Sequence, residues 1–257
     1  MSAPFLTTEK LHLRLPGRVL CQSLGFSLKA GECWGILGQN GAGKTTLLHT
    51  LAGLHPPQGG EIQLCGDPLQ TLSRREIAHR LGLMPQDTPD PFPATVLETA
   101  LIGRHPHLSR WQWESRQDIA MAQTALHQVG LSGFARRQVN TLSGGERRRL
   151  ALATLLVQAP PVMLLDEPVN HLDLRHQHQV LSLLQQQSKK GHAVIMVLHD
   201  INHAARYCDH VLLMFNDGET LHGTNREVLE AKRLSRLYEY PIVMQHSATE
   251  KWFMARR

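Results

Sequence analysis

Short apolar runs alternate with longer segments of helical periodicity along most of the chain. Five of these runs have the length of β-strands and lie at residues 33–37, 82–84, 162–165, 193–198 and 211–215. Strands that are apolar throughout and separated by helix-length segments are typical of a parallel sheet covered by helices. The pattern therefore predicts an α/β fold with a mostly parallel central sheet.

The strand pattern disappears between Pro89 and Asn140. Residues 96–103 and 114–130 have helical periodicity instead. Prolines, among them Pro91, punctuate this stretch and mark the breaks between its helices. We therefore expect a helical insertion between two strands of the sheet.

The segment after residue 215 is less regular than the rest. An Asn-Asp-Gly sequence at 216–218 predicts a turn. Short helical pieces are expected within 226–240, and a last strand near Trp252.

The composition fits one globular unit. Of 257 residues, 42% are hydrophobic and 19% charged, so a sizeable core can form and wholesale disorder is excluded. No internal repeat or low-complexity segment is visible, and we expect a single domain over residues 1–257. No apolar run reaches the roughly 18 residues of a membrane-spanning helix, so we expect no span.

Charge and cysteine usage narrow the cellular setting. With 27 Lys and Arg against 22 Asp and Glu, the formal net charge is +5, a weak field for a nucleic-acid partner. The N-terminus lacks the basic start and apolar stretch of a secretory signal, which predicts the cytoplasm. No Cys-x-x-Cys pair occurs, so reduced thiols are expected at Cys21, Cys33, Cys65 and Cys208.

A glycine-rich loop follows the first of these strands. It matches the phosphate-loop pattern G-x-x-x-x-G-K-[ST] and opens a helical run at 45–52. Its glycines let backbone N–H groups surround the β- and γ-phosphates, Lys44 adds a positive charge, and Thr45 offers its hydroxyl to Mg²⁺. We expect a nucleotide to bind Gly38, Gln39, Asn40, Gly41, Ala42, Gly43, Lys44, Thr45 and Thr46.

Two adjacent acidic residues follow the strand at 162–165. Ligands of open α/β sheets bind at the carboxyl ends of the strands, so Asp166 is expected beside the phosphate loop, holding Mg²⁺ directly or through water. A carboxylate one residue further on can polarise a water in line with the γ-phosphate. We expect Glu167 to be this general base.

A pair of glycines shortly before this strand forms a second candidate phosphate site. Ser143 has the position of a helix N-cap, and the two glycines that follow let exposed amides approach an anion. Together with the phosphate loop and the acidic pair in this order, the pentapeptide resembles the hallmark of ATP-binding cassette (ABC) proteins. It consists of Leu142, Ser143, Gly144, Gly145 and Glu146.

This resemblance implies a fold and further site residues. ABC ATPases are P-loop NTPases with a RecA-like, mostly parallel core, an N-terminal antiparallel β-subdomain and a helical subdomain, here at about residues 89–157. Gln86 resembles the Q-loop glutamine, His199 the switch histidine, and Asp173 the D-loop aspartate at the dimer interface. The implied catalytic residues are Glu167, His199 and Gln86. The implied ligands of the Mg²⁺ that accompanies ATP are Thr45, Gln86 and Asp166.

The resemblance also implies an assembly. In ABC ATPases the signature loop of one chain, here at Ser143, closes over the phosphate loop of another, here at Lys44, so we expect a homodimer with two ATP molecules between its chains. A cassette without a membrane span implies a transmembrane permease dimer and, indirectly, a periplasmic substrate-binding protein. The implied location is peripheral, on the cytoplasmic face of the bacterial inner membrane, with no nucleic-acid partner.

Two further segments look like the ATPases of bacterial type II importers for ferric siderophores, haem and vitamin B12. They are residues 91–96 followed by 102–107, and residues 199–209. The implied reaction is ATP and water to ADP and phosphate, which energises uptake of an iron complex or vitamin B12 through the permease. An ABC ATPase of another substrate class, or of an exporter, stays open as an alternative. A soluble ABC ATPase that acts on nucleic acid or ribosomes is disfavoured, because the chain has one uninterrupted cassette.

Other residues invite interpretations of their own. Leu15 stands where ABC proteins usually place an aromatic residue against adenine, so the selectivity between ATP and GTP stays open. Arg147, Arg148 and Arg149 are expected to spread around their helix as a solvated or membrane-proximal face. The scattered histidines lack the spacing of metal ligands. Surface positions are expected for His105, His107, His171, His176, His178, His203 and His210.

Overall fold

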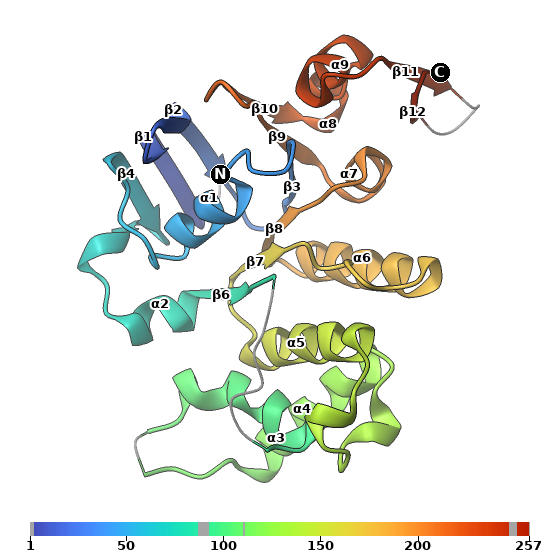
Figure 1. The fold of residues 1–257 in the computed structure, drawn as a ribbon. Coiled ribbons are helices and arrows are strands. Elements are labelled where there is room, and N and C mark those ends of the chain that lie inside the picture. Colours follow the sequence, from blue (N-terminus) through green and yellow to red (C-terminus); the bar gives the residue numbers. More distant parts are fainter. Residues whose placement is uncertain (1–2, 87–92, 110, 247–250, 257) are drawn as a thin grey trace.

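The computed structural model of the chain describes residues 3–86, 93–109, 111–246 and 251–256. Within them, a six-stranded central sheet has the order β10-β9-β3-β8-β7-β6 (Figure 1). Neighbouring strands pair in parallel, except that β9 and β10 pair with each other in an antiparallel manner. This confirms the predicted mostly parallel sheet. The strands are β3 Cys33–Leu37, β6 Leu81–Met84, β7 Val162–Asp166, β8 Ala193–Val197, β9 His210–Met214 and β10 Thr220–Thr224.

Side chains of the central strands alternate between two hydrophobic cores. In β8, Ala193, Ile195 and Val197 belong to one core, and Val194 and Met196 to the other. All five are buried, because structure covers both faces of the sheet. Burial on both faces explains why these strands appear in the sequence as unbroken apolar runs.

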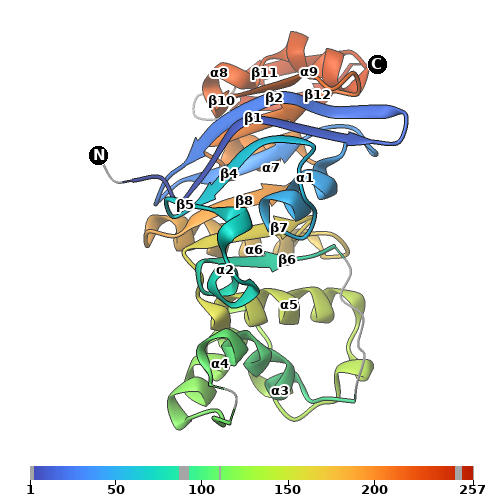
Figure 2. The ribbon, with the colours of Figure 1, turned by 90° about the vertical axis from the view of Figure 1, so that its left-hand side faces the viewer.

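A second, four-stranded sheet covers one face of the central sheet, together with helix α1 (Figures 1 and 2). Its order is β2-β1-β4-β5, and its strands pair in an antiparallel manner, as the resemblance implied. Leu6 of β1, Leu47 of α1 and Ile36 of β3 share the core between the two sheets. The elements are β1 Leu6–Leu15, β2 Arg18–Leu28, α1 Lys44–Leu51, β4 Gly59–Leu64 and β5 Asp67–Pro68.

Helices form a separate layer at one end of the molecule, between β6 and β7 in the chain (Figure 1). The helix expected at 96–103 is α-helical to Leu101 and continues as a 3₁₀ helix to His107, because Pro106 cannot donate a backbone hydrogen bond. The expected start of the insertion at residue 89 lies outside the described residues, as does Pro91. The α-helices of this layer are α3 Val96–Leu101, α4 Arg116–Gln128 and α5 Gly144–Gln158, with 3₁₀ helices at Ile102–His107, Ser132–Phe134 and Val139–Thr141.

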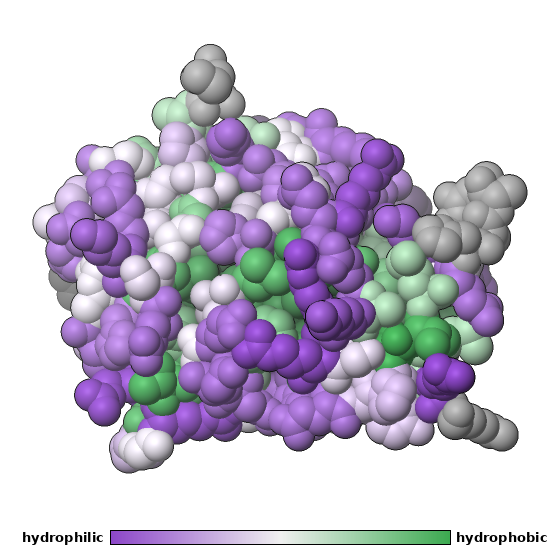
Figure 3. Space-filling view, turned by 90° about the horizontal axis from the view of Figure 1, so that it is seen from above, coloured by the Kyte–Doolittle hydropathy of each residue, from purple (hydrophilic) through white to green (hydrophobic). Residues whose placement is uncertain are grey.

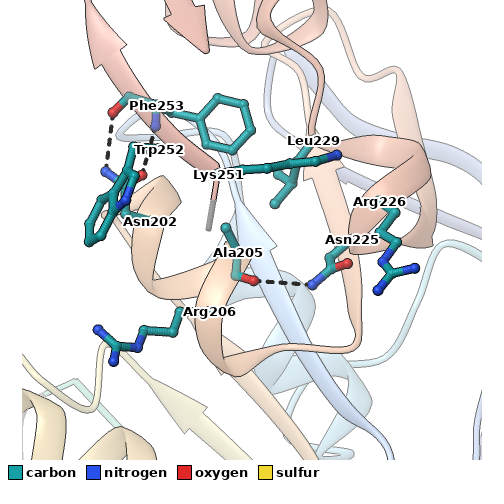
Figure 4. Close-up of a pocket in the computed structure, with 9 residues that line it drawn as sticks. All are labelled: Asn202, Ala205, Arg206, Asn225, Arg226, Leu229, Lys251, Trp252 and Phe253. Carbon is teal, nitrogen blue, oxygen red and sulfur yellow. Dashed lines mark hydrogen bonds between the residues drawn. The ribbon is translucent and has the colours of Figure 1, made fainter. Parts of the chain in front are cut away.

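The remaining elements flank the central sheet and continue into a C-terminal hairpin. Asn202 of α7 fastens this hairpin, because its side-chain amide donates to the carbonyl oxygen of Phe253 at 3.1 Å and accepts from the Phe253 N–H at 2.8 Å (Figure 4). The face of the molecule that is seen from above the view of Figure 1 is mostly hydrophilic, and its hydrophobic residues lie in separate areas (Figure 3). These elements are α2 Arg74–Arg80 after a 3₁₀ helix at Leu69–Thr71, α6 Leu174–Lys189, α7 Ile201–Tyr207, α8 Asn225–Val228, α9 Ala231–Tyr238, β11 Ile242–His246 and β12 Lys251–Ala255.

The structure also bears on membrane spans and thiols. Across residues 3–256, leaving out the gaps given above, no helix combines the length and the apolar character that crossing a bilayer requires. All four cysteines are free thiols, and of these Cys65 alone is exposed.

Candidate functional site

The phosphate loop joins β3 to α1 at the carboxyl edge of the central sheet. Gly41 and Gly43 have φ angles of 81° and 94°, in the left-handed region that glycine adopts at little cost. A Cβ atom on Gly43 would lie 2.9 Å from the Cδ atoms of Leu20, and one on Gly38 would lie 2.7 Å from the carbonyl oxygen of Met214. The packing therefore requires glycine at positions 38 and 43.

Lys44 folds back onto this loop. Its Nζ atom donates hydrogen bonds to the carbonyl oxygens of Gly38 and Gln39, both at 2.8 Å. Burial lowers the pKa of its ammonium group, and the negative charges of Glu167 and Asp166 oppose that fall. The cation is thus held beside the loop amides, where an anionic phosphate can meet both.

Asp166 ends β7 in a fully buried position. Neither oxygen of its carboxylate has a hydrogen-bond partner among the described residues. Burial raises the pKa of this carboxyl, and the neighbouring Thr45 hydroxyl opposes the rise. A buried carboxylate that lacks donors is costly unless a cation balances it, and carboxylate, hydroxyl and amide oxygens are ligands that Mg²⁺ prefers. Asp166, Thr45 and Gln86 therefore fit the expected metal.

Glu167 lies at the centre of a polar cluster. Gln86 donates from Nε2 to Glu167 Oε2 at 3.1 Å, Asn170 donates to the same oxygen, and Nε2 of His199 lies 2.5 Å from Oε1. These partners follow the carboxyl ends of β6, β7 and β8, which are neighbours in the sheet. The side chains that fix the carboxylate thus come from three separate loops.

The backbone of Glu167 is also unusual. Its φ angle is 51°, a left-handed conformation that is rare for a residue with a side chain. Such a conformation costs about 1–3 kcal/mol and persists where the surroundings enforce it. Strain of this kind concentrates at functional sites, which agrees with the position of Glu167 in a cleft that the phosphate loop also lines.

One cleft of about 640 Å³ unites most of the expected nucleotide and catalytic residues. Leu15, at the end of β1, is 45% exposed there and offers apolar contact in the place of the usual aromatic residue. Gly38, Gln39 and Ala42 lie outside the cleft lining. The lining residues are Leu15, Asn40, Gly41, Gly43, Lys44, Thr45, Thr46, Gln86, Glu167, Asn170 and His199. This arrangement can bind a polyphosphate through the Lys44 cation and the backbone amides of the loop. The Glu167 carboxylate can accept a hydrogen bond from a water molecule.

The signature pentapeptide lies in a second cleft. Ser143 caps α5, because its Oγ accepts from the Glu146 N–H at 3.2 Å while Glu146 Oε2 accepts from the Ser143 N–H at 2.8 Å. The lining of this cleft shares no described residue with that of the first. It consists of Ser143, Gly144, Gly145, Glu146, Arg149, His171, Leu172, Asp173 and His176. Leu142 is buried and does not line this cleft.

Asp173 caps helix α6 at the edge of this second cleft. Its carboxylate accepts from the backbone N–H of His176 at 2.9 Å and lies 2.9 Å from Nδ1 of the same imidazole. These contacts, the backbone N–H first, lower the pKa of Asp173. The carboxylate itself stays exposed, so it is available to a second molecule.

Two expectations from the sequence were wrong. Arg148 is buried rather than part of a solvated face, whereas Arg147 and Arg149 are half-buried. His203 is buried rather than at the surface, and burial lowers the pKa of its imidazole. Within the described ranges, no group of three or more His, Cys, Asp or Glu side chains is placed to hold a metal ion.

Two residues that contact the site were not expected there from the sequence. Arg148 donates to the backbone carbonyl oxygen of Glu167, and Asn170 donates to the Glu167 carboxylate. A signal for Arg148 was present, because it precedes the buried Leu152 and Leu155 by four and seven residues and so shares their helix face. Asn170 carried no comparable pattern, since its role depends on the turn after β7.

Comparisons with known proteins agree with this geometry. The sequence model of the ABC transporter family matches residues 21–170. A hemin import ATP-binding protein of Deinococcus radiodurans is 43% identical over 218 residues, which are 83% of this chain and 82% of that protein. A solved inward-facing conformation of a metal-chelate type ABC transporter has a TM-score of 0.87 at 29% identity, over 100% of this chain and 98% of the other.

A dimeric ATP-binding cassette is also similar. It was solved in a post-hydrolysis state with ADP and phosphate, and it has a TM-score of 0.74 at 25% identity, over 86% of this chain and 99% of the other. The family match spans more than half of the chain and includes both the phosphate loop and the acidic pair. The chain therefore belongs to the ABC transporter family and is an ATPase that energises transport.

Proposed function

We propose that this chain is the ATP-hydrolysing subunit of a bacterial importer for an iron complex, a ferric siderophore or haem, or for vitamin B12. It would work peripherally at the cytoplasmic face of the inner membrane with a separate permease dimer and, indirectly, a periplasmic binding protein. Support for the substrate class comes from its similarity to a hemin import protein and to a metal-chelate type transporter.

The observation that carries the proposed hydrolysis is the hold on Glu167. Its carboxylate faces the phosphate cleft and is fixed by Gln86, Asn170 and His199. We assign Glu167 the role of general base, which takes a proton from the attacking water. His199 would orient the carboxylate and contact the γ-phosphate, and Gln86 would complete the catalytic set.

The phosphate loop would bind ATP. Residues 38–46 present their backbone amides, and Lys44 adds a charge whose position the loop carbonyls already determine. Thr45, Gln86 and Asp166 are the residues that would hold Mg²⁺, and the two unpartnered oxygens of Asp166 support this assignment. The ion would neutralise charge on the β- and γ-phosphates.

We also propose that two copies of the chain build each ATP site. The pentapeptide of residues 142–146 would contribute from one chain and the phosphate loop from the other, with Asp173 at the interface. Two observations support this: the clefts at Lys44 and Ser143 are separate, and a similar cassette is dimeric. Within one domain over residues 1–257, about residues 89–157 would act as the helical subdomain that carries Ser143.

Transport into liposomes tests the proposal. The chain is purified with its permease, reconstituted, and supplied with ATP and with the binding protein loaded with a ferric siderophore, haem or cobalamin. We expect ATP-dependent uptake of one of the three, and none with the Glu167→Gln variant. ATP-dependent movement in the opposite direction, or ATP hydrolysis that no chelate stimulates, would contradict the proposed import function.

A further inference from the structure

Arg148 extends from α5 to the ends of two central strands. Its Nη1 atom donates to the carbonyl oxygens of Pro85 and Gln86 at 2.6 and 2.7 Å, and its Nε donates to that of Glu167 at 3.2 Å. Its Nη2 donates to the carbonyl oxygen of Asp166. One buried guanidinium therefore bonds to the backbone of three proposed catalytic or metal-binding residues.

These carbonyls lie just beyond the ladder that joins β6 to β7. The last pair of this ladder is Met84 with Leu165, so the two strands separate at the next residues. Arg148 bridges the gap with hydrogen bonds from a charged donor, which are stronger than those between neutral groups. Its five N–H groups in a rigid plane suit several carbonyl acceptors at once.

The neighbouring arginines have different acceptors. Arg149 donates to the carbonyl oxygens of Val129 and Gly130 at 2.9 and 3.2 Å, within the helical layer. Arg147 donates to those of Leu142 and Asn140, also within that layer. Among the hydrogen bonds between described residues, those of Arg148 reach the ends of β6 and β7.

We infer that Arg148 is a positioning residue that couples the signature helix α5 to the catalytic carboxylate of its own chain. The inference rests on the proposed role of Glu167 as general base. Arg148 lies five residues after Ser143 on one rigid helix, so a shift of α5 that accompanies docking of Ser143 moves the guanidinium as well. The guanidinium then carries the carbonyl of Glu167 and, with it, the left-handed backbone that aims the carboxylate.

This coupling gives α5 two functions. Its N-terminus presents the pentapeptide to the other chain, and its second turn holds Gln86 and Glu167 in its own cleft. Each active site then responds to the docking of the signature loop on the same chain, as well as to the loop that closes over it. The partner whose docking Arg148 would transmit to the active site is a second copy of this chain.

The test compares Arg148→Gln with Arg75→Gln in the complex with the permease. Arg75 of α2 also donates to backbone carbonyl oxygens, those of Pro106 and Leu108 at 3.0 and 2.7 Å, but lines neither cleft. A neutral amide cannot supply the planar set of donors, so we expect kcat for ATP hydrolysis to fall roughly tenfold or more in Arg148→Gln, from the loss of a charged hydrogen bond. KM for ATP is expected to stay within about twofold, because the phosphate loop is unchanged. Arg75→Gln is expected to keep kcat, and Arg148→Lys to restore part of it.

A second measurement needs no activity. The backbone N–H of Asn170 donates to the carbonyl oxygen of Glu167 at 3.2 Å, next to the bond from Arg148. Hydrogen exchange at this amide is expected to be faster in Arg148→Gln but unchanged in Arg75→Gln. If Arg148→Gln does not fold, the same increase is expected in Arg148→Lys. Equal exchange and equal kcat in the two glutamine variants would overturn the positioning role.

Glu167→Gln in the same assay separates the two levels of the proposal. If Glu167→Gln is inactive while Arg148→Gln hydrolyses ATP like the unmodified chain, the positioning role is wrong and the general base stands. If Glu167→Gln keeps full activity, the base assignment is wrong. If kcat and thermal stability fall in parallel in Arg148→Gln and Arg148→Lys, Arg148 only stabilises the fold.

Discussion

The carboxylate of Glu167 and the imidazole of His199 are in contact, with 2.5 Å between Oε1 and Nε2, although 32 residues separate them in the chain. They meet because β7 and β8 are neighbours in the parallel sheet, where Asp166 pairs with Val197. The carboxyl ends of parallel strands bring distant loops to one edge. The proposed catalytic pair is therefore a product of strand order.

Replacing Glu167 by glutamine removes the proposed base but keeps the size of the side chain. We expect ATP hydrolysis to fall about 10²- to 10⁴-fold, the usual contribution of a general base. Nucleotide affinity, measured by calorimetry, is expected to persist, and ATP is expected to hold the variant as a closed dimer. Glu230→Gln, at an exposed position far along the chain, serves as the control. Hydrolysis at the unmodified rate would exclude Glu167 as the base.

Lys44→Ala tests the phosphate cradle. The loop carbonyls of Gly38 and Gln39 hold the ammonium group in place, so its loss removes a charge-assisted contact to phosphate. At about 1.5–3 kcal/mol for such a contact, ATP affinity is expected to fall roughly 10- to 100-fold. Lys190→Ala, at the exposed end of α6, is expected to bind ATP normally. Unchanged affinity in Lys44→Ala is incompatible with the proposed cradle.

Mixed dimers test whether two chains share each site. One chain carries Lys44→Ala, and the other carries Ser143→Arg, which places a bulky side chain at the signature loop. In a mixed dimer both lesions fall on one composite site and the second site stays intact, so we expect about half of the sites to bind ATP in the closed state. Binding stoichiometry distinguishes the arrangements. Sites built within single chains would both be impaired, each by its own lesion.

The stability of the helical layer is expected to depend on pH through Asp118. The hydroxyl and backbone N–H of Ser115, and then the guanidinium of Arg104 at 2.7 Å, lower the pKa of Asp118 from 3.8 to about 2. Because folding favours the ionised form, this contribution is present above about pH 4 and is lost as the pH falls from 4 towards 2.

Asp118→Asn examines this contribution. We expect a lower midpoint of urea unfolding at pH 7 than for the unmodified chain, because the capping carboxylate and the ion pair with Arg104 are lost. The difference between the two proteins is expected to shrink between pH 4 and pH 2. Equal destabilisation at every pH would show that the charge of Asp118 does not contribute.

Much of the site could be predicted before the fold was known. The phosphate loop has its own local signature, since glycines at positions 41 and 43 meet a backbone requirement that the neighbouring residues already define. Asp166 follows a strand that is apolar throughout, and this places it at an edge of the sheet. Ser143 with Glu146 forms a capping box, which is recognisable from spacing alone.

The surroundings of these residues could not be predicted in the same way. The charge of Arg148 suggested that it faces solvent, but the ends of β6 and β7 provide four carbonyl acceptors that make its burial favourable. His203 likewise lies inside because α7 packs against α6, where its ring stacks edge-on to that of His178 with centroids 5.7 Å apart. Burial of a polar side chain depends on which acceptors other elements bring.

The sequence by itself determined the parallel sheet, the phosphate loop and the order of the motifs, because each follows from short-range patterns of apolar side chains, glycines and caps. The tertiary structure alone decided which side chains hold Glu167 and that the clefts at Lys44 and Ser143 are separate. These features depend on strand order and helix packing, which join residues that are far apart in the chain. A motif can thus supply a functional group, while its orientation is set by contacts that no local pattern encodes.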